Sequence, residues 1–137
     1  MGIFSWFKRK KREEIQLSEE ELKWNKMWEL WENEEVESPY FELMTYYSEV
    51  NNGGHGQFWD YVSDNGDLST YLNSLYKIMP DELKENINKS YKAYLEMCEV
   101  EYSEAADEVL MKCDEVFAEN ENVIENILKE YANSIVL

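Results

Sequence analysis

The sequence predicts an all-α fold, a compact multi-helix domain of about six or seven helices. Apolar residues recur three or four positions apart through most of the chain, which is the spacing of one helical face. The alternating β-branched runs that are typical of strands are missing. The 137 residues are 44% hydrophobic and 15% aromatic, which is enough to build one core. We therefore expect a single helical domain.

The first predicted helix covers residues 18–34. Ser18 and Glu21 have the spacing of a capping box, in which each side chain hydrogen-bonds the backbone of the other residue. Trp24, Trp28 and Trp31 then lie on one helical face. Packing in the core is the favoured interpretation of these tryptophans, and a dimer contact is the alternative.

Further helices are predicted between segments rich in turn-forming residues. Ser38 as N-cap and Pro39 in the first turn begin a helix that ends near residue 50. Gly53 and Gly54 then permit a left-handed turn, and a short third helix follows as far as residues 64–66. Four more segments have helical apolar spacing, and they begin near residues 67, 80, 103 and 122.

Residues 1–16 form a separate arm in front of the helical domain, which we assign to residues 17–137. The arm is apolar first and then strongly basic, with five consecutive cations at positions 8–12. This order differs from that of a signal peptide. A loosely ordered or partner-packed arm is the favoured interpretation, and weak contact with an anionic membrane surface is the alternative.

The charge of the chain favours cationic partners. It contains 30 acidic and 13 basic residues, for a formal net charge of -17. Such a field repels nucleic acid and anionic membranes and attracts basic proteins, so we expect no direct contact with nucleic acid. Cys98 and Cys113 lie on apolar helical stripes, which predicts buried free thiols in a reducing cytoplasm. One histidine and two distant cysteines predict neither a metal site nor a cofactor.

Acidic residues on the later helices fall largely outside the apolar stripes. Neighbours three or four residues apart on a helix lie close together, so these residues predict rows of negative charge. One interpretation is that these residues form a hydrated surface with no binding role. The functional interpretation is a surface that imitates DNA phosphates, which requires two adjacent helices or a dimer. The candidate partner-binding residues are Glu96, Glu99, Glu101, Glu104, Asp107, Glu108, Glu115 and Glu119.

His55 is the only histidine, and it lies among glycines. An enzyme at this turn requires a pocket that joins His55 to an orienting group such as Glu49, Asp60 or Tyr61. Because no nucleophile lies near His55 in the sequence, a structural role in the turn is favoured. We expect that the chain is not an enzyme.

The segment 49–59 resembles the signature of a bacterial all-helical family of mostly unknown function that includes a dimeric DNA mimic. The resemblance rests on a helix that ends in Asn-Gly-Gly and on a Gln-aromatic pair that opens the next helix, with matching residues Glu49, Asn52, Gly53, Gly54, Gln57 and Phe58. It implies that the glycine motif is structural, that Glu49 and Gln57 hydrogen-bond freed backbone groups, and that the chain is a homodimer. It also implies that the acidic rows occupy the DNA-binding surface of a helix-turn-helix regulator. His55 departs from the pattern, because the family tends to place an aromatic residue there.

Together these features predict a non-catalytic acidic protein-binding module, in the form of a DNA mimic that binds a basic DNA-binding protein. The alternative is an immunity-like inhibitor of a basic toxin or nuclease, which would use the same electrostatic attraction.

Overall fold

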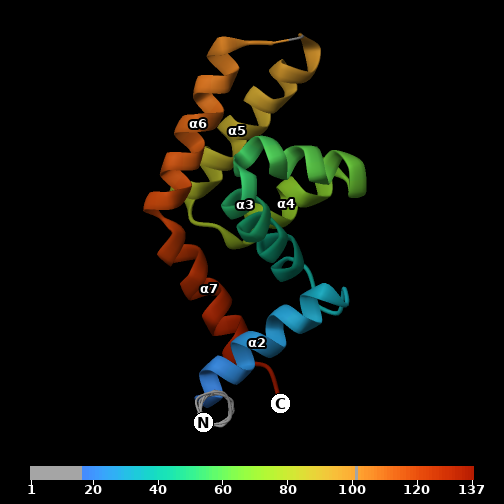
Figure 1. Ribbon diagram of the computed structural model, residues 1–137, viewed down its shortest axis with the longest axis vertical. Coiled ribbons are helices and arrows are strands. Elements are labelled where there is room, and N and C mark those ends of the chain that lie inside the picture. The colour runs from blue at the N-terminus through green and yellow to red at the C-terminus, as the bar shows by residue number, and fades with distance from the viewer. Residues whose placement is uncertain (1–16, 101) are drawn as a thin grey trace, which may run out of the picture.

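The computed structural model describes residues 17–100 and 102–137, and the chain is helical through most of these residues (Figure 1). The predicted all-α class is confirmed, because the described residues form helices and no strands. The basic arm at residues 1–16 and the candidate residue Glu101 lie outside the described part of the chain. The helices are α2 (Glu19–Glu32), α3 (Tyr40–Asn65), α4 (Leu68–Ile78), α5 (Asp81–Glu99), α6 (Glu104–Glu119) and α7 (Glu121–Asn133).

The starts of α2 and α6 follow from serine caps. Ser18 Oγ accepts a hydrogen bond of 3.1 Å from the backbone N–H of Glu21, so the predicted N-cap is confirmed, and it also donates to the Glu21 carboxylate, which therefore bonds the Ser18 hydroxyl in place of the backbone N–H of a full capping box. Ser103 Oγ accepts from the N–H of Ala106 at 3.2 Å. The predicted cap at Ser38 is wrong, because this hydroxyl donates instead to the carboxylate of Glu42 at 2.6 Å.

The two helices predicted around the glycine turn are both present within α3, where they meet directly at Gly53 and Gly54. Within residues 40–65 only Gly53 and Gly54 leave the helical conformation, so α3 has a kink where the sequence predicts a loop. The helix resumes at once, because the carboxylate of Asp114 on α6 accepts the backbone N–H of His55 beyond the kink. The predicted helix ends near residues 50 and 65 are therefore correct, but the connection between them is shorter than expected.

The main core surrounds α3, which contacts α4, α5, α6 and α7. Tyr46, Phe58 and Trp59 from both halves of α3 are fully buried in it. The stripe Trp24, Trp28 and Trp31 on α2 packs against this core but remains partly exposed. The tryptophans thus line the edge of the core, with Trp28 and Trp31 in an edge-to-face contact of 5.3 Å between ring centroids, and the dimer contact stays a prediction.

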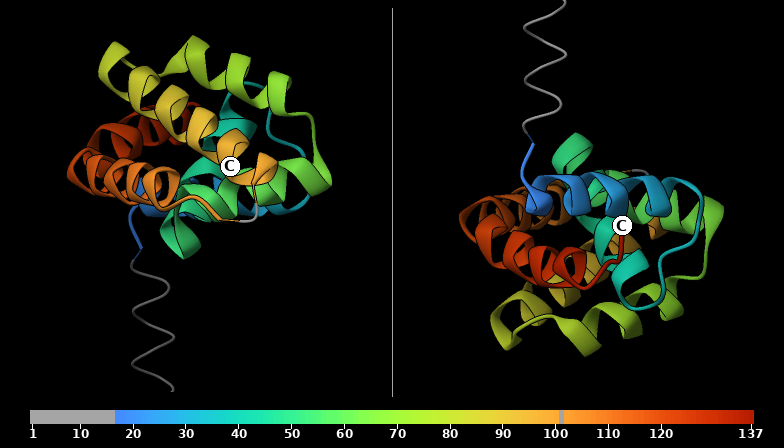
Figure 2. Two further views of the ribbon diagram at one scale, coloured as in Figure 1. Left: turned by 90° about the horizontal axis from the view of Figure 1, so that it is seen from above. Right: turned by 90° about the horizontal axis from the view of Figure 1, so that it is seen from below.

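The α5–α6 hairpin extends past the other helices at one end of the molecule (Figure 1). Its outer half has its own small cluster of Ala93, Ala106 and Leu110, against which Met97 packs. This cluster is separate from the main core. The opposite end of the molecule holds α2 beside α7, close to the C-terminus, as the views in Figure 1 and Figure 2 agree.

The two cysteines differ in exposure. Cys113 is buried, as predicted, whereas Cys98 is exposed, so the prediction for Cys98 is wrong. Cys98 comes one residue before the end of α5, where the hairpin extends past the core that would cover it. Within the described residues, none of the helices combines the length and the apolar composition that crossing a membrane requires.

Candidate functional site

The candidate acidic residues lie on the α5–α6 hairpin. Those that are exposed to solvent are Glu96, Glu99, Glu104, Glu108, Glu115 and Glu119, whereas Asp107 is half-buried. Glu101, the remaining candidate, is in the short connection outside the described residues. The carboxylate of Glu96 also accepts a hydrogen bond of 3.2 Å from Ser103 Oγ, which joins the two helices near the tip of the hairpin.

Four of these residues form a line along the outer side of α6. We call Glu104, Glu108, Glu115 and Glu119 the acidic ridge. Their spacings of four, seven and four residues place them on one side of a helix with 3.6 residues per turn. The buried residues of α6, among them Leu110 and Phe117, lie on its other side. The ridge covers 15 residue steps, or about 22 Å at 1.5 Å per residue.

Cations are scarce around the acidic ridge. Residues 96–125 contain 11 acidic residues and one basic residue, Lys112, whereas residues 17–95 contain 16 acidic residues and six lysines. The carboxylate–lysine ion pairs that the structure describes lie on α2 and on the first half of α5. Within residues 17–100 and 102–137, no glutamate of the ridge belongs to an ion pair. Lys112 nevertheless lies on the same side of α6, four residues after Glu108 and three before Glu115, so the ridge combines four carboxylates with one cation.

The neighbouring helix α5 supplies a second acidic row only at its tip. Glu96 and Glu99 lie there, but Lys84, Lys89 and Lys92 are interspersed with acids farther down the helix. Lys89, for example, pairs with Glu85 at 3.2 Å. A double row of carboxylates is thus confined to the outer end of the hairpin, and the rest of the acidic surface is a single row on α6.

The glycine motif is a kink whose geometry only glycine tolerates. Gly54 has φ of 82° and ψ of -177°, a region of backbone conformation that side chains strongly disfavour. A Cβ atom at Gly54 would also lie 2.5 Å from Asp114 Oδ2. The side chains of Glu49 and Gln57 bond each other across the kink at 3.0 Å. The expectation that Glu49 and Gln57 hydrogen-bond backbone groups freed at the kink is therefore wrong. The side chain of Asp114 accepts the freed N–H of His55 instead.

His55 is the centre of a buried polar network that the sequence does not reveal. Its side chain is fully buried. One oxygen of Asp114, Oδ1, lies 2.8 Å from the backbone nitrogen of His55 and 2.6 Å from Nδ1, and the hydroxyl of Tyr46 lies 2.7 Å from Nε2. In the neutral imidazole, Nδ1–H donates to Asp114 and Nε2 accepts from Tyr46. Asp114 therefore fixes both the backbone and the ring of His55.

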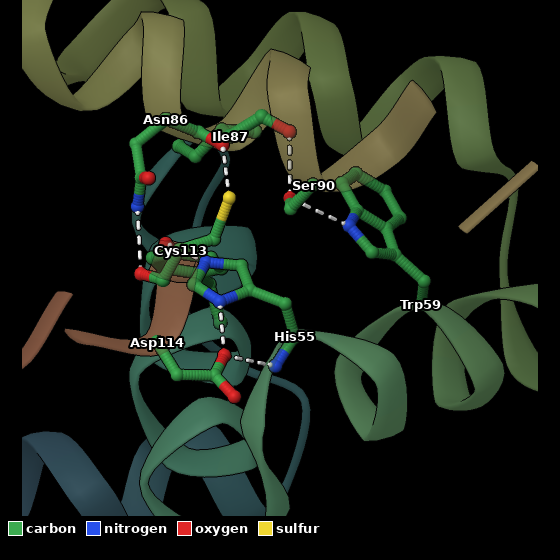
Figure 3. A network of polar contacts seen from close by, with 8 residues as sticks. His55, Trp59, Asn86, Ile87, Ser90, Cys113 and Asp114 are labelled. Atoms are coloured by element: carbon green, nitrogen blue, oxygen red, sulfur yellow. Dashed lines mark hydrogen bonds and ion pairs between the residues drawn. The ribbon is translucent and has the colours of Figure 1, made fainter. Parts of the chain in front are cut away.

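A second pair of hydrogen bonds fixes α5 against α6 beside His55 (Figure 3). Asn86 Nδ2 donates to the backbone oxygen of Cys113 at 3.0 Å, and the Cys113 thiol donates to the backbone oxygen of Asn86 at 3.5 Å. Trp59, on the second half of α3, donates from Nε1 to Ser90 Oγ on α5 at 3.0 Å. These bonds satisfy polar groups inside the domain, which indicates a structural network.

The enzyme alternative at the glycine turn required a pocket that joins His55 to Glu49, Asp60 or Tyr61. The structure contradicts that arrangement, because His55 has no exposed surface and contacts Asp114 and Tyr46 instead. His55 lines none of the hollows that the structure describes, one of which lies between α2 and α7. Within the described residues, no three His, Cys, Asp or Glu side chains form a group that could hold a metal ion. The expectation that the chain is not an enzyme stays a prediction.

Sequence patterns missed Asp114, although it is the residue that organises the turn. It lies 59 positions from His55 and is half-buried on α6, next to the buried Cys113. A carboxylate beside an apolar stripe is the only signal in the sequence, and many other acids of this chain share it. Only the packing of α6 against the kink of α3 selects Asp114 from among them.

Burial of Cys113 makes the stability of the domain depend on pH above neutrality. Loss of solvation raises the pKa of the Cys113 thiol from its ordinary 9.0 to about 11. Between pH 9 and pH 11 this thiol ionises in the unfolded chain but not in the folded one, so the unfolded state is favoured. We expect the free energy of unfolding to fall by about 2–3 kcal/mol over that window, at 1.36 kcal/mol per pH unit.

Urea denaturation of the wild type and of Cys113→Ala at pH 8, 9, 10 and 11 tests this expectation. Burial also raises the pKa of Tyr46 from 10.0, so tyrosine ionisation contributes above pH 10 in both proteins. Because that contribution is common to both, the difference between the two proteins from pH 9 to pH 10 isolates Cys113. Equal losses of stability in the two proteins over that interval would refute the assignment.

Comparison of the chain with protein-family models, with curated proteins and with solved structures finds no match. The resemblance of the glycine motif to the family of helical DNA mimics therefore stays a prediction. What the chain does must be argued from its own surface.

Proposed function

We propose that the chain is a non-catalytic binding module whose acidic ridge binds the DNA-binding surface of a basic protein, such as a helix-turn-helix regulator. One observation carries the proposal: four exposed glutamates form a line about 22 Å long on α6, and no described lysine pairs with them. The outer part of the hairpin extends beyond the other helices, so a large partner can reach Glu104 and Glu108 without touching the rest of the domain, whereas Glu119 lies next to the start of α7 (Figure 1).

Electrostatic attraction to the ridge affects the association rate and depends on salt. Exposed carboxylates keep most of their hydration until a partner arrives, so they contribute mainly to the association rate and to the choice of partner. A cationic surface that normally faces phosphates is complementary to them. The contact weakens as salt screens the charges, because the Debye length is only about 8 Å at physiological ionic strength.

The acidic ridge carries fewer charges per unit length than duplex DNA. Duplex DNA presents one phosphate charge per about 1.7 Å of axis, which corresponds to roughly 13 charges over 22 Å. The ridge presents four carboxylates over that length, and Glu96 and Glu99 add to it only at the tip. With Lys112 in the same row, the ridge of a single chain thus offers a net charge of about a quarter of that of duplex DNA. A homodimer that places two ridges side by side would double this to roughly half the charge density of the duplex, so we include dimerisation in the proposal.

Reversal of charge on the ridge tests the proposal. Glu108→Lys combined with Glu115→Lys changes the net charge by four, and Glu32→Lys combined with Glu82→Lys changes it equally at exposed positions away from the ridge. Each protein is immobilised and exposed to extract of the native host at low and at physiological salt, and bound proteins are quantified by mass spectrometry. We expect a basic DNA-binding protein that the wild type and the control retain at low salt and that the ridge variant binds at least tenfold more weakly.

Competition with DNA distinguishes mimicry from mere attraction. The recovered partner is purified, and duplex DNA containing its binding site is added to its complex with the chain. We expect the DNA to displace the chain in proportion to its own affinity. Equal binding by the two double variants, or a complex that is insensitive to salt, would contradict the role of the ridge. Recovery of a basic toxin or nuclease would instead support an immunity-like inhibitor.

A further inference from the structure

A groove lies between α2 and α7, at the end of the molecule opposite the hairpin tip (Figure 1). Its volume is about 610 Å³, within the range of about 300–1,000 Å³ that is typical of ligand pockets. Leu17, Trp24 and Ala132 give it an apolar lining, to which the aliphatic stem of Lys129 contributes. The polar residues that line it are Glu20, Glu21, Asn25 and Asn133. The groove is thus suited to an apolar group that is attached to a cationic one.

The chain itself contains a segment with this composition. Residues 3–7 include Ile3, Phe4, Trp6 and Phe7, and five cations follow at positions 8–12. The segment joins the helical domain at Leu17, which is itself part of the groove lining. The aromatic residues are therefore covalently attached to one edge of the groove through about ten residues of chain.

The length of this connection allows the segment to fold back into the groove. Ten residues reach at most about 35 Å when fully extended, and the groove begins at the attachment point, so only a loop is required. A short tether that is long enough to span two sites holds the attached group at an effective concentration in the millimolar range. Even weak affinity for the groove would therefore keep it occupied by the segment of the same chain.

Charge also favours the N-terminal segment over a second copy as the occupant. Glu19, Glu20 and Glu21 are exposed in the first turn of α2. The basic run would lie close to them once the aromatic residues entered the groove. Two copies that met through this groove would instead bring the same glutamates of both chains together, which is unfavourable.

We propose that Phe4, Trp6 and Phe7 bind in the groove between α2 and α7 of their own chain, with the basic residues 8–12 over the glutamates at the start of α2. The N-terminal segment is then an intramolecular ligand of the helical domain. It covers Trp24, and it neutralises one end of a molecule whose acidic ridge lies at the other. This inference is independent of the partner proposed for the ridge.

Photo-crosslinking in the full chain tests this arrangement. The photoreactive residue p-benzoylphenylalanine replaces Phe7, and equal amounts of ¹⁵N-labelled and unlabelled protein are mixed before irradiation so that links within and between chains can be told apart. We expect links within one chain from position 7 to the peptides that contain Trp24 and Ala132. Links scattered over the whole surface, or links between chains at the groove, would overturn the proposal.

Two exposed asparagines provide a matched pair of control variants. Asn25→Arg adds bulk and positive charge to the groove, whereas Asn122→Arg makes the same change on α7 away from it. We expect at least a fivefold loss of groove links with Asn25→Arg and no loss with Asn122→Arg, after circular dichroism has shown that both variants are folded. Equal yields from the two variants would show that the segment does not bind in the groove.

Discussion

Substitution of Gly54 by alanine is expected to destabilise the domain by about 3–5 kcal/mol. The backbone of Gly54 has φ of 82° and ψ of -177°, and holding a side chain in such a region costs about 1–3 kcal/mol. The new methyl group would also lie 2.5 Å from Asp114 Oδ2, so the carboxylate must move. That movement weakens the hydrogen bonds from Asp114 to His55, and bonds to charged groups contribute about 1.5–3 kcal/mol each.

Gly56→Ala is the matched control, two residues away on the same helix. Its nearest new contact would be Leu110 Cδ1 at 4.0 Å, and its backbone is helical. Alanine at a position with compatible backbone angles stabilises by about 0.4–1 kcal/mol, because it restricts the unfolded chain. Urea denaturation followed by circular dichroism measures both variants. If they differed from each other by less than 1 kcal/mol, the strain assigned to Gly54 would be absent.

Loss of the Asp114 carboxylate is expected to produce the second large effect. Asp114→Ala leaves the N–H of His55 at the kink without its cap, at a cost of about 0.5–2 kcal/mol. It also leaves the buried Nδ1–H unsatisfied, at a cost of about 1–3 kcal/mol. We expect a total loss of about 2–4 kcal/mol. Asp114→Asn retains an oxygen that can accept a hydrogen bond, so we expect it to lose about half as much.

The neighbouring Glu115→Ala controls for the removal of one negative charge from α6. Glu115 is exposed and belongs to no described ion pair, so its replacement should change stability by at most about 0.5 kcal/mol. Thermal and urea denaturation of the three variants at pH 7 compare the effects. A loss of stability no larger in Asp114→Ala than in Glu115→Ala would show that the His55 network contributes little to folding.

Local patterns predicted the helices well, because each pattern acts within one or two turns. Ser18 and Glu21 are neighbours on the first turn of α2, and their mutual hydrogen bonds need no other part of the fold. The glycines at positions 53 and 54 likewise marked the point at which α3 departs from helical geometry. At Ser18 the residue type and its nearest neighbours are sufficient to determine the backbone, whereas at the kink they fix only the position of the break, because the helix resumes on Asp114.

The environment of His55 was not predictable for the opposite reason. Its position among glycines suggests an open turn, but α6 covers it, and its partner Asp114 is distant in sequence. The acidic ridge is an intermediate case. Helical spacing predicted that Glu104 and Glu108 share one face, but only the packing of α5 against α6 shows that the carboxylates of α5 add to this row at the tip alone.

The contrast between the two cysteines makes the chain suitable for selective chemical labelling. A thiol reacts through its thiolate and must be reached by the reagent, so the buried Cys113, whose pKa is raised to about 11, is protected in the folded protein. Cys98 is exposed next to Glu99 at the outer end of α5. A maleimide dye would therefore mark a single position in the native chain, close to the carboxylates at which a bound protein would change its fluorescence.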